Sequence, residues 1–415
     1  MKKTAELIKI TDTTAGNAVS IDIEKQMEKA ADRFSAAIKP GTRIAITVGS
    51  RGITDYDRII RAVADAVRKA GAEPFIIPAM GSHGGATAEG QKQLLAEHGI
   101  TEETMGAEII SSMETVELDS EGLENRVFMD RNAYESDGVI LVNRVKAHTD
   151  FQGEIESGLV KMSLIGLGKH DQAKEIHRFG VDGLKNKLIP SAEKVIGTGK
   201  ILLGVAISEN HLGQTTDLEV IEANRIIERE KEILADYKAK NKGLPVNDID
   251  ILIVDEFGKN ICGCGMDPVL IGRRKIRGAE EFTSPDIKNI IVVNLSEGSG
   301  GNALGIGLAD YTVRETVEKI NWGITYENII TSTFTERGKL PIVAENVEQA
   351  LEWASRTSGN VEEGNLRIMR IRNTTDISTM YVSENIYDEL GEDWADYDSE
   401  GFVGIIDEKG NLRDF

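Results

Sequence analysis

Three of the six histidines in this sequence, together with two lysines set among glycines, lie in the stretch from Asn143 to Arg178. The apolar run from Gly138 to Val142 precedes this stretch and predicts a buried strand that enters a polar loop. Glycine lets the backbone approach a ligand closely, and lysine and histidine side chains can bind an anion or a metal. We therefore expect the loop to hold an anionic cofactor or a metal. The alternative is a glycine-rich turn with solvated lysines.

Within this stretch, Lys161 has apolar neighbours on both sides, which predicts partial burial. Burial disfavours the charged form of an amine and makes it nucleophilic. The alternative is a lysine with a buried stem and a solvated ammonium group. His170 and His177 could face one side of a helix that we expect to start at Asp171. Their spacing is not an established metal signature such as HExxH.

A second candidate is the glycine loop from Met80 to Gly85, in which His83 has no bulky neighbour. Its backbone amides, among them those of Ser82 and Gly84, could form an anion-binding nest before a helix. The loop matches neither GxxxxGK[ST] nor GxGxxG. The alternative is a histidine that only satisfies a hydrogen bond within the loop.

The first part of the chain follows a βαβ pattern. Strands are predicted at 43–48 and 74–78, and helices at 55–70 and 87–98. Ligands bind at the carboxyl ends of the strands in such sheets, and Arg51, His83 and the loop after Val142 all fall there. The charged stretch 218–240 is expected to be a long helix with a solvated face.

A second α/β unit is predicted after the linker 241–245. Strands at 251–255 and 290–295 run into loops at 258–268 and 296–302, which are candidates for one wall of a ligand cleft. Lys259 could reach into such a cleft. A basic patch suits a carboxylate or a phosphate, with a solvated cluster as the alternative, and consists of Arg273, Arg274, Lys275 and Arg277.

The composition favours a cytoplasmic protein that binds neither nucleic acid nor membranes. The chain carries 48 Lys+Arg against 69 Asp+Glu, a formal net charge of −21, whereas nucleic acid requires a basic face. The N-terminus lacks the apolar run of a secretory signal, and no stretch approaches the ~20 apolar residues of a membrane span. Cys262 and Cys264 are expected to be reduced thiols, and the sequence leaves a homo-oligomer open.

Taken together, these residues resemble the nickel-dependent lactate racemase family, most closely from Ala79 to Arg178. The resemblance implies two α/β domains, which we place at 1–245 and 246–385, with a ligand cleft between them. For the tail, 386–415, the sequence leaves open whether it packs back on the first domain. The resemblance also implies nickel in a nickel-pincer nucleotide (pyridinium-3-thioamide-5-thiocarboxylic acid mononucleotide). One arm of this cofactor is bonded to a lysine, and other proteins are needed for its maturation.

The catalytic residues are carried over one by one. In the loop 81–83, which resembles the family's Gly-Thr-His loop, His83 takes the place of one catalytic histidine. His148, in a position that resembles the family's Pro-His motif, takes the place of the second. Lys161 matches the lysine to which the cofactor is attached, and His177 matches the histidine that binds nickel.

The family's remaining cofactor and substrate contacts match this sequence only in part. Arg51 matches the arginine of the family's Asp-x-x-Arg motif, but Val48 stands at the aspartate position. In the second domain, Asp267 and Lys275 fit the segment that supplies a substrate-binding lysine. The implied cofactor contacts beside Lys161 are Arg51, Ser82 and Gly84, and the implied substrate contacts are Arg51, Lys275, Arg273 and Lys259.

The implied activity is that of an isomerase, a racemase or C2-epimerase of a 2-hydroxy acid that passes through a 2-keto acid. Hydride transfer to a cofactor avoids a carbanion at a carbon that is hardly acidic. The hydroxyl proton must leave as well, and the two enantiomers require a base on each face, which His83 and His148 would provide. Arg51 and a cation of the second domain should hold the carboxylate.

Two other functions stay open at this point. One is a zinc-dependent hydrolase or lyase that uses His83, His148 and His177. The other is a non-catalytic binding protein for an anionic metabolite.

Overall fold

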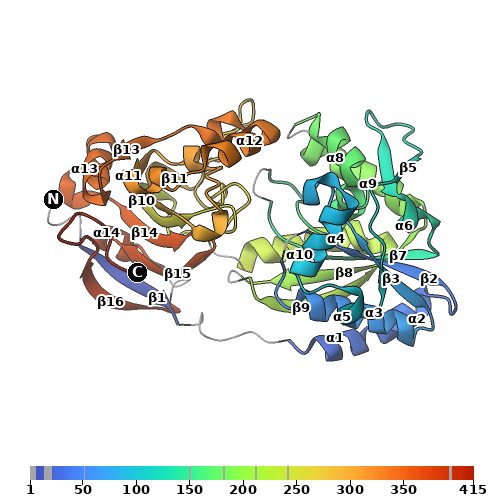
Figure 1. The fold of residues 1–415 in the computed structure, drawn as a ribbon. Coiled ribbons are helices and arrows are strands. Elements are labelled where there is room, and N and C mark those ends of the chain that lie inside the picture. The colour runs from blue at the N-terminus through green and yellow to red at the C-terminus, as the bar shows by residue number, and fades with distance from the viewer. Residues whose placement is uncertain are drawn as a thin grey trace. The chain divides into compact units, whose positions relative to one another are not determined.

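The computed structural model describes residues 6–13, 21–50, 52–148, 151–180, 183–210, 213–240, 243–391 and 395–415. The chain forms two compact units (Figure 1). The N-terminal unit is Ala18–Asn241, and the C-terminal unit combines Met1–Asn17 with Lys242–Phe415. Each unit contains a sheet with helices, which confirms the predicted α/β class. No helix among the described residues is long and apolar enough to cross a membrane.

The N-terminal unit is built on a six-stranded sheet in which all neighbours are parallel except the last pair. Its order is β4 (Glu108–Ile109), β3 (Glu73–Pro78), β2 (Arg43–Val48), β7 (Gly138–Arg144), β8 (Ile201–Glu209) and β9 (Thr215–Glu222). The central strands are almost continuously apolar because both faces of a parallel sheet are covered. A separate two-stranded sheet joins β5 (Thr115–Leu118) to β6 (Val127–Asp130).

Side chains of β2 alternate between two hydrophobic cores, as the period of a strand requires. Ile44 and Ile46 belong to a core shared with α1 (Ile23–Lys29), α2 (Ala31–Ala37) and α3 (Tyr56–Lys69). Ala45 belongs to the other core, which α9 (Leu188–Gly197) and α10 (Ile226–Lys240) complete.

The predicted strands and helices of the βαβ pattern are confirmed to within one or two residues. The predicted helices at 55–70 and 87–98 are α3 and α4 (Ala88–Glu97). Because β3 and β7 lie on either side of β2, the loops after these three strands meet at one edge of the sheet. The short helices α5 (Glu102–Met105) and α6 (Arg131–Glu135) lie in the connections.

A bent helical segment follows the loop after β7. It begins with α7 (Leu159–Lys161), continues as the π-helical turn η2 (Met162–Gly166) and ends with α8 (Lys169–His177). Lys169 has φ of +55°, in the left-handed region, so the helix bends there. π-Helical turns are frequent at functional sites.

The C-terminal unit contains an eight-stranded mixed sheet. Its order is β13 (Ile342–Ala344), β12 (Tyr311–Val313), β11 (Asp286–Leu295), β10 (Asp248–Phe257), β14 (Ile368–Asn373), β15 (Asp376–Val382), β1 (Glu6–Asp12) and β16 (Tyr397–Gly404). Its helices are α11 (Arg314–Glu318), α12 (Trp322–Ser332), α13 (Val347–Thr357) and α14 (Glu384–Tyr387).

Two sequence-based expectations differ from the structure. The expected first domain 1–245 does not include β1, because the segment that carries β1 belongs to the C-terminal unit, where the tail strand β16 pairs with it. The stretch 218–240 is not one helix, because residues up to Glu222 form β9 and pair with β8. Only α10 is a long helix in this stretch, and its residue Glu230 is fully buried rather than solvated.

Candidate functional site

His148 and Lys161 are in direct contact. Nζ of Lys161 lies 2.5 Å from Nε2 of His148, and both side chains are half-buried. The sequence placed them in one loop region, and the fold brings their side chains together although thirteen positions separate them. An amine and an imidazole at this distance can exchange a proton, which suits a nucleophile with an adjacent base.

The loop that carries His148 is held by a buried carboxylate. Oε2 of Glu156 accepts the backbone N–H of His148 at 2.6 Å, and Oε1 accepts that of Gly153 at 2.9 Å. Glu156 is fully buried and also pairs with Lys238 of α10. The ring of Phe151 packs on the imidazole with a centroid distance of 4.6 Å. These contacts fix both the backbone and the ring of His148.

His83 lies on the loop after β3, and side-chain hydrogen bonds hold the backbone of this loop. Nδ1 of His83 lies 2.7 Å from the carbonyl oxygen of Met80. Nε2 of Gln91, in α4, donates to the carbonyl oxygens of Gly81 at 2.9 Å and His83 at 3.2 Å. If the hydrogen bond to Met80 is donated by Nδ1–H, the neutral ring presents Nε2 as its basic nitrogen.

Ser82 and Gly84 flank His83 on this loop. Ser82 is exposed. Gly84 has φ of +66°, and a Cβ atom there would lie 2.6 Å from the backbone nitrogen of Gln91. Glycine is therefore required at position 84 by the close packing of the loop on α4, whatever the loop binds.

A fully buried lysine supports the His83 loop. Nζ of Lys169 lies 3.1 Å from Oδ2 of Asp130 and 3.5 Å from Oε1 of Gln91, and it donates to the carbonyl oxygen of Pro78 at the end of β3. Burial lowers the pKa of Lys169, and the Asp130 carboxylate counteracts this effect. Lys169 thus connects the bent helix to the strand and the helix on both sides of the His83 loop.

The other proposed metal and cofactor residues are less closely tied to this pair. His177 is exposed at the last position of α8, on the same bent helical segment as Lys161. The described residues contain no group of three or more His, Cys, Asp or Glu side chains arranged to hold a metal. His83, His148 and His177 are all described, so they do not form the three-histidine zinc site considered above. Arg51 lies outside the described residues.

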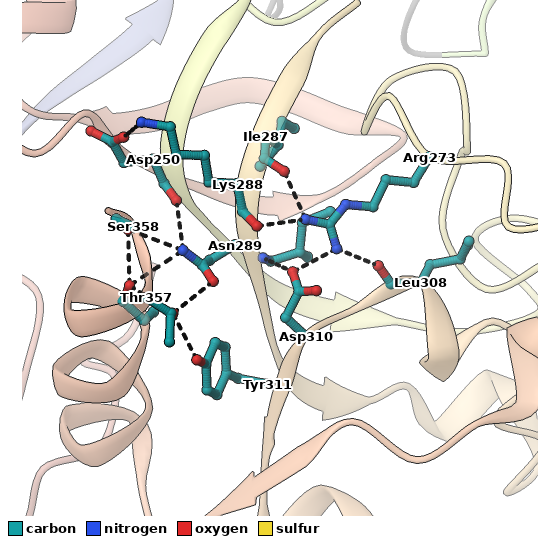
Figure 2. Close-up of polar contacts among 12 residues, drawn as sticks. Asp250, Arg273, Ile287, Lys288, Asn289, Leu308, Asp310, Tyr311, Thr357 and Ser358 are labelled. Carbon is teal, nitrogen blue, oxygen red and sulfur yellow. Dashed lines mark hydrogen bonds and ion pairs between the residues drawn. The ribbon is translucent and has the colours of Figure 1, made fainter. Parts of the chain in front are cut away.

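Arg273 is bound by partners within its own unit (Figure 2). Its guanidinium donates to Asp310 Oδ2 at 2.5 Å and to the carbonyl oxygens of Ile287, Lys288 and Leu308. These partners lie at the amino ends of β11 and β12, whereas ligands of such sheets bind at the carboxyl ends. Both terminal nitrogens of the Arg273 guanidinium are thus engaged within the fold, which favours a structural role for this residue, and its binding of the substrate carboxylate stays a prediction.

Lys275 and Lys259 remain accessible in the C-terminal unit. Lys275 is half-buried with φ of +48°, and its backbone N–H donates to Glu281. Lys259 is exposed on the loop after β10, and its Nζ donates to Oδ1 of Asn328. A hollow of about 450 Å³ lies beside this contact and is lined by Asn302, Gly323, Ile324, Glu327 and Asn328.

Several residues of this site were not identified from the sequence. Glu230 in α10 is the clearest case, since it is fully buried and accepts the backbone N–H of Val160 at 2.9 Å. A signal was present, because Glu230 follows the buried Ile226 by four positions and precedes the buried Leu234 by four, so that it lies on the apolar face of the helix. Asp130, Glu156 and Gln91 are also buried polar residues whose partners lie far along the chain, but the sequence shows no pattern that marks them.

Comparisons with known proteins bear on the fold. Residues 37–242 match the family model described as "Domain of unknown function (DUF362)". A comparison with curated proteins gave no significant match. Among solved structures, the chain is similar to the lactate racemase apoprotein from Thermoanaerobacterium thermosaccharolyticum. The TM-score is 0.55 at 11% identity, over 89% of this chain and 98% of that chain. At this identity the similarity shows that the two chains share a fold.

Proposed function

We propose that this protein is an isomerase, a racemase or C2-epimerase of a 2-hydroxy acid that works with a nickel-pincer nucleotide tethered to Lys161. The observation that carries the proposal is the 2.5 Å contact between Lys161 and His148. It puts an amine suited to covalent attachment next to an imidazole suited to proton transfer. The shared fold with a lactate racemase apoprotein agrees with this reading.

The side chains near Lys161 suit such a cofactor. A half-buried amine on a helical turn can be held in one position while it is acylated, and His177 offers an exposed imidazole farther along the same bent helix. Nickel bound mainly by an organic cofactor needs only one such protein ligand, which His177 could supply while Lys161 carries the cofactor. When bound, the cofactor serves as a reversible hydride acceptor.

The residues of the chain would supply the proton chemistry. Oxidation of a 2-hydroxy acid at C2 releases the hydroxyl proton, and reduction of the 2-keto acid from its other face takes a proton up. His148 and His83 lie on different loops at the same edge of the sheet, so each could serve one enantiomer. Arg51, Lys259 and Lys275 stay as proposed ligands of the substrate carboxylate.

Intact-mass spectrometry tests the proposal directly. Protein co-expressed with the cofactor-making enzymes should carry an adduct that peptide mapping assigns to Lys161, and it should invert C2 of at least one acid in a panel of 2-hydroxy acids and aldonates. Lys161→Met should carry no adduct and be inactive. Lys174→Met, an exposed lysine of the same bent helix, should keep both.

Two outcomes would decide against the proposal. Active protein without an adduct would show that the chemistry does not need Lys161. Protein that binds a hydroxy acid tightly, with no adduct and no stereochemical change, would be a binding protein for an anionic metabolite. Zinc hydrolysis receives less support, because His83, His148 and His177 do not form a ligand cluster.

A further inference from the structure

The helical turn that carries Lys161 begins at a residue without a side chain. Gly158 is the N-cap of α7 and provides no side-chain hydrogen bond to the first turn. The first N–H groups of a helix have no partner within the helix, and an N-cap side chain usually satisfies one of them. Here the acceptor comes from a distant part of the chain, because Oε2 of Glu230 accepts the N–H of Val160 at 2.9 Å.

Gly158 and Glu230 fit each other closely. A Cβ atom at position 158 would lie 2.4 Å from both Cδ and Oε1 of Glu230, and the three nearest atoms all belong to that carboxyl group. The φ of Gly158 is −178°, which any residue can adopt, so the backbone conformation does not require glycine there. Glycine is required because the Glu230 carboxyl group occupies the space.

The same turn is held from the other side by the loop after β7. Nδ2 of Asn143 donates to the carbonyl oxygen of Gly158 at 2.9 Å. Lys146 and Ser157 exchange two backbone hydrogen bonds, at 2.8 and 3.2 Å. Since His148 follows Lys146 by two positions, this clamp ties the loop of His148 to the turn of Lys161.

Capping the helix with Glu230 requires the burial of a carboxyl group, which is unfavourable. Glu230 is fully buried, and Oε1 has no hydrogen-bond partner. Burial raises the pKa of Glu230 to about 7, although the N–H groups of Val160 and Leu159 favour the charged form. A serine at the N-cap would satisfy the same N–H without a buried carboxyl group. The unusual arrangement therefore suggests a role in placement rather than in stability.

We propose that Glu230 is a positioning residue, whose carboxyl group holds the turn 158–161 so that Nζ of Lys161 meets Nε2 of His148. This inference deepens the proposed function, since it rests on Lys161 and His148 as the functional pair. Glu230 acts through backbone contacts and does not itself touch the reacting groups.

Histidine-selective ¹⁵N NMR of the apoprotein tests the inference without any assay of turnover. The chain has six histidines, and His148→Gln assigns the His148 signal. Lys161→Met gives the Nε2 shift of His148 without its partner. Glu230→Ala should move this signal at least about half of the way toward the Lys161→Met value, because the uncapped turn no longer fixes the lysine. Glu230→Gln, which keeps an acceptor oxygen, should leave it near the wild-type position.

Two variants at position 158 provide independent checks. Gly158→Ala places a methyl group against the Glu230 carboxyl group and should also move the His148 signal, even if Glu230→Ala does not fold. Gly158→Ser in the Glu230→Ala background supplies a local N-cap oxygen and should bring the signal back toward wild type. Thermal unfolding of each variant shows whether a change is local or global.

The results separate this inference from the proposed function. An unchanged His148 signal in folded Glu230→Ala and Gly158→Ala would overturn the positioning role, even if the wild type is an active racemase. The expected NMR pattern in a protein that never acquires an adduct would leave the positioning role in place and overturn the proposed function.

Discussion

Nζ of Lys161 and Nε2 of His148 are 2.5 Å apart, so the two nitrogens can share one proton but cannot each carry one toward the other. If Lys161 forms an amide-type bond to a cofactor, its nitrogen loses its basicity and His148 no longer shares a proton with it. Attachment would then convert His148 from the partner of an amine into a base for the substrate. This relation makes the roles of the two side chains experimentally separable.

His148→Gln should keep the adduct on Lys161 and lose turnover. Loss of a general base lowers kcat by about 10²–10⁴-fold, while attachment needs only the amine. Intact mass and a chiral assay of the product measure the two properties on the same sample. Near wild-type turnover in His148→Gln would remove His148 from the proton chemistry, and loss of the adduct would assign it to attachment instead.

Lys169→Met should destabilise the protein strongly. The substitution leaves the fully buried carboxylate of Asp130 without its cation, which costs about 3–5 kcal/mol in comparable buried pairs. Urea unfolding measures the change. Adding Asp130→Asn should recover part of the loss, because the unpaired charge is then gone, and a double variant no more stable than Lys169→Met would contradict the pairing.

Gln91→Met tests the support of the His83 loop with a smaller expected loss of stability. It removes the donors to the carbonyl oxygens of Gly81 and His83 but leaves the buried ion pair in place. We expect turnover to fall by about tenfold, since misplaced catalytic groups lose rate steeply, with a smaller loss of stability than in Lys169→Met. Unchanged turnover would show that the position of the His83 loop does not limit the reaction.

The sequence predicted the elements of the site better than the contacts that hold it. Strand and turn patterns placed the loops after β2, β3 and β7 correctly, because hydrophobic periodicity and glycine are local signals. The π-helical turn η2 and the left-handed Lys169 carry no such signal. Lys169 is held there by residues far along the chain, Pro78 and Asp130, which no local pattern could identify.

The environments of charged residues were predicted least reliably from the sequence. The glutamates of α10 and the patch at 273–277 were both read as surface features or ligand contacts, yet Glu230 is fully buried and Arg273 is bound within the fold. A charged residue is buried when a distant segment provides its partner, as the N–H of Val160 and the carboxylate of Asp310 do here. Sequence periodicity cannot identify that partner.

Arg273→Ala and Lys259→Ala should affect different properties: the first should lower stability, and the second should raise KM. Loss of Arg273 leaves Asp310 and three carbonyl groups without their donor, so we expect about 2–4 kcal/mol of destabilisation and an unchanged KM in the folded enzyme. Loss of the exposed Lys259 should change stability by less than about 0.5 kcal/mol and raise KM by roughly tenfold if it binds the carboxylate. Denaturant unfolding and steady-state kinetics separate the two, and a raised KM in Arg273→Ala would support it as a substrate ligand.

Glu230 should make the protein less stable as the pH rises toward neutrality. Burial raises its pKa in the folded state from the usual 4.5 to about 7, so the folded protein binds this proton more tightly than the unfolded chain does. The resulting stabilisation is complete below about pH 4.5 and is lost as the pH rises through 7. Between pH 5 and 8 the loss should be about 2.5 kcal/mol. Glu230→Gln does not titrate, so the difference in unfolding free energy between wild type and Glu230→Gln isolates this contribution from all other groups. A difference that stays constant over this pH range would mean that Glu230 is charged in the folded protein throughout.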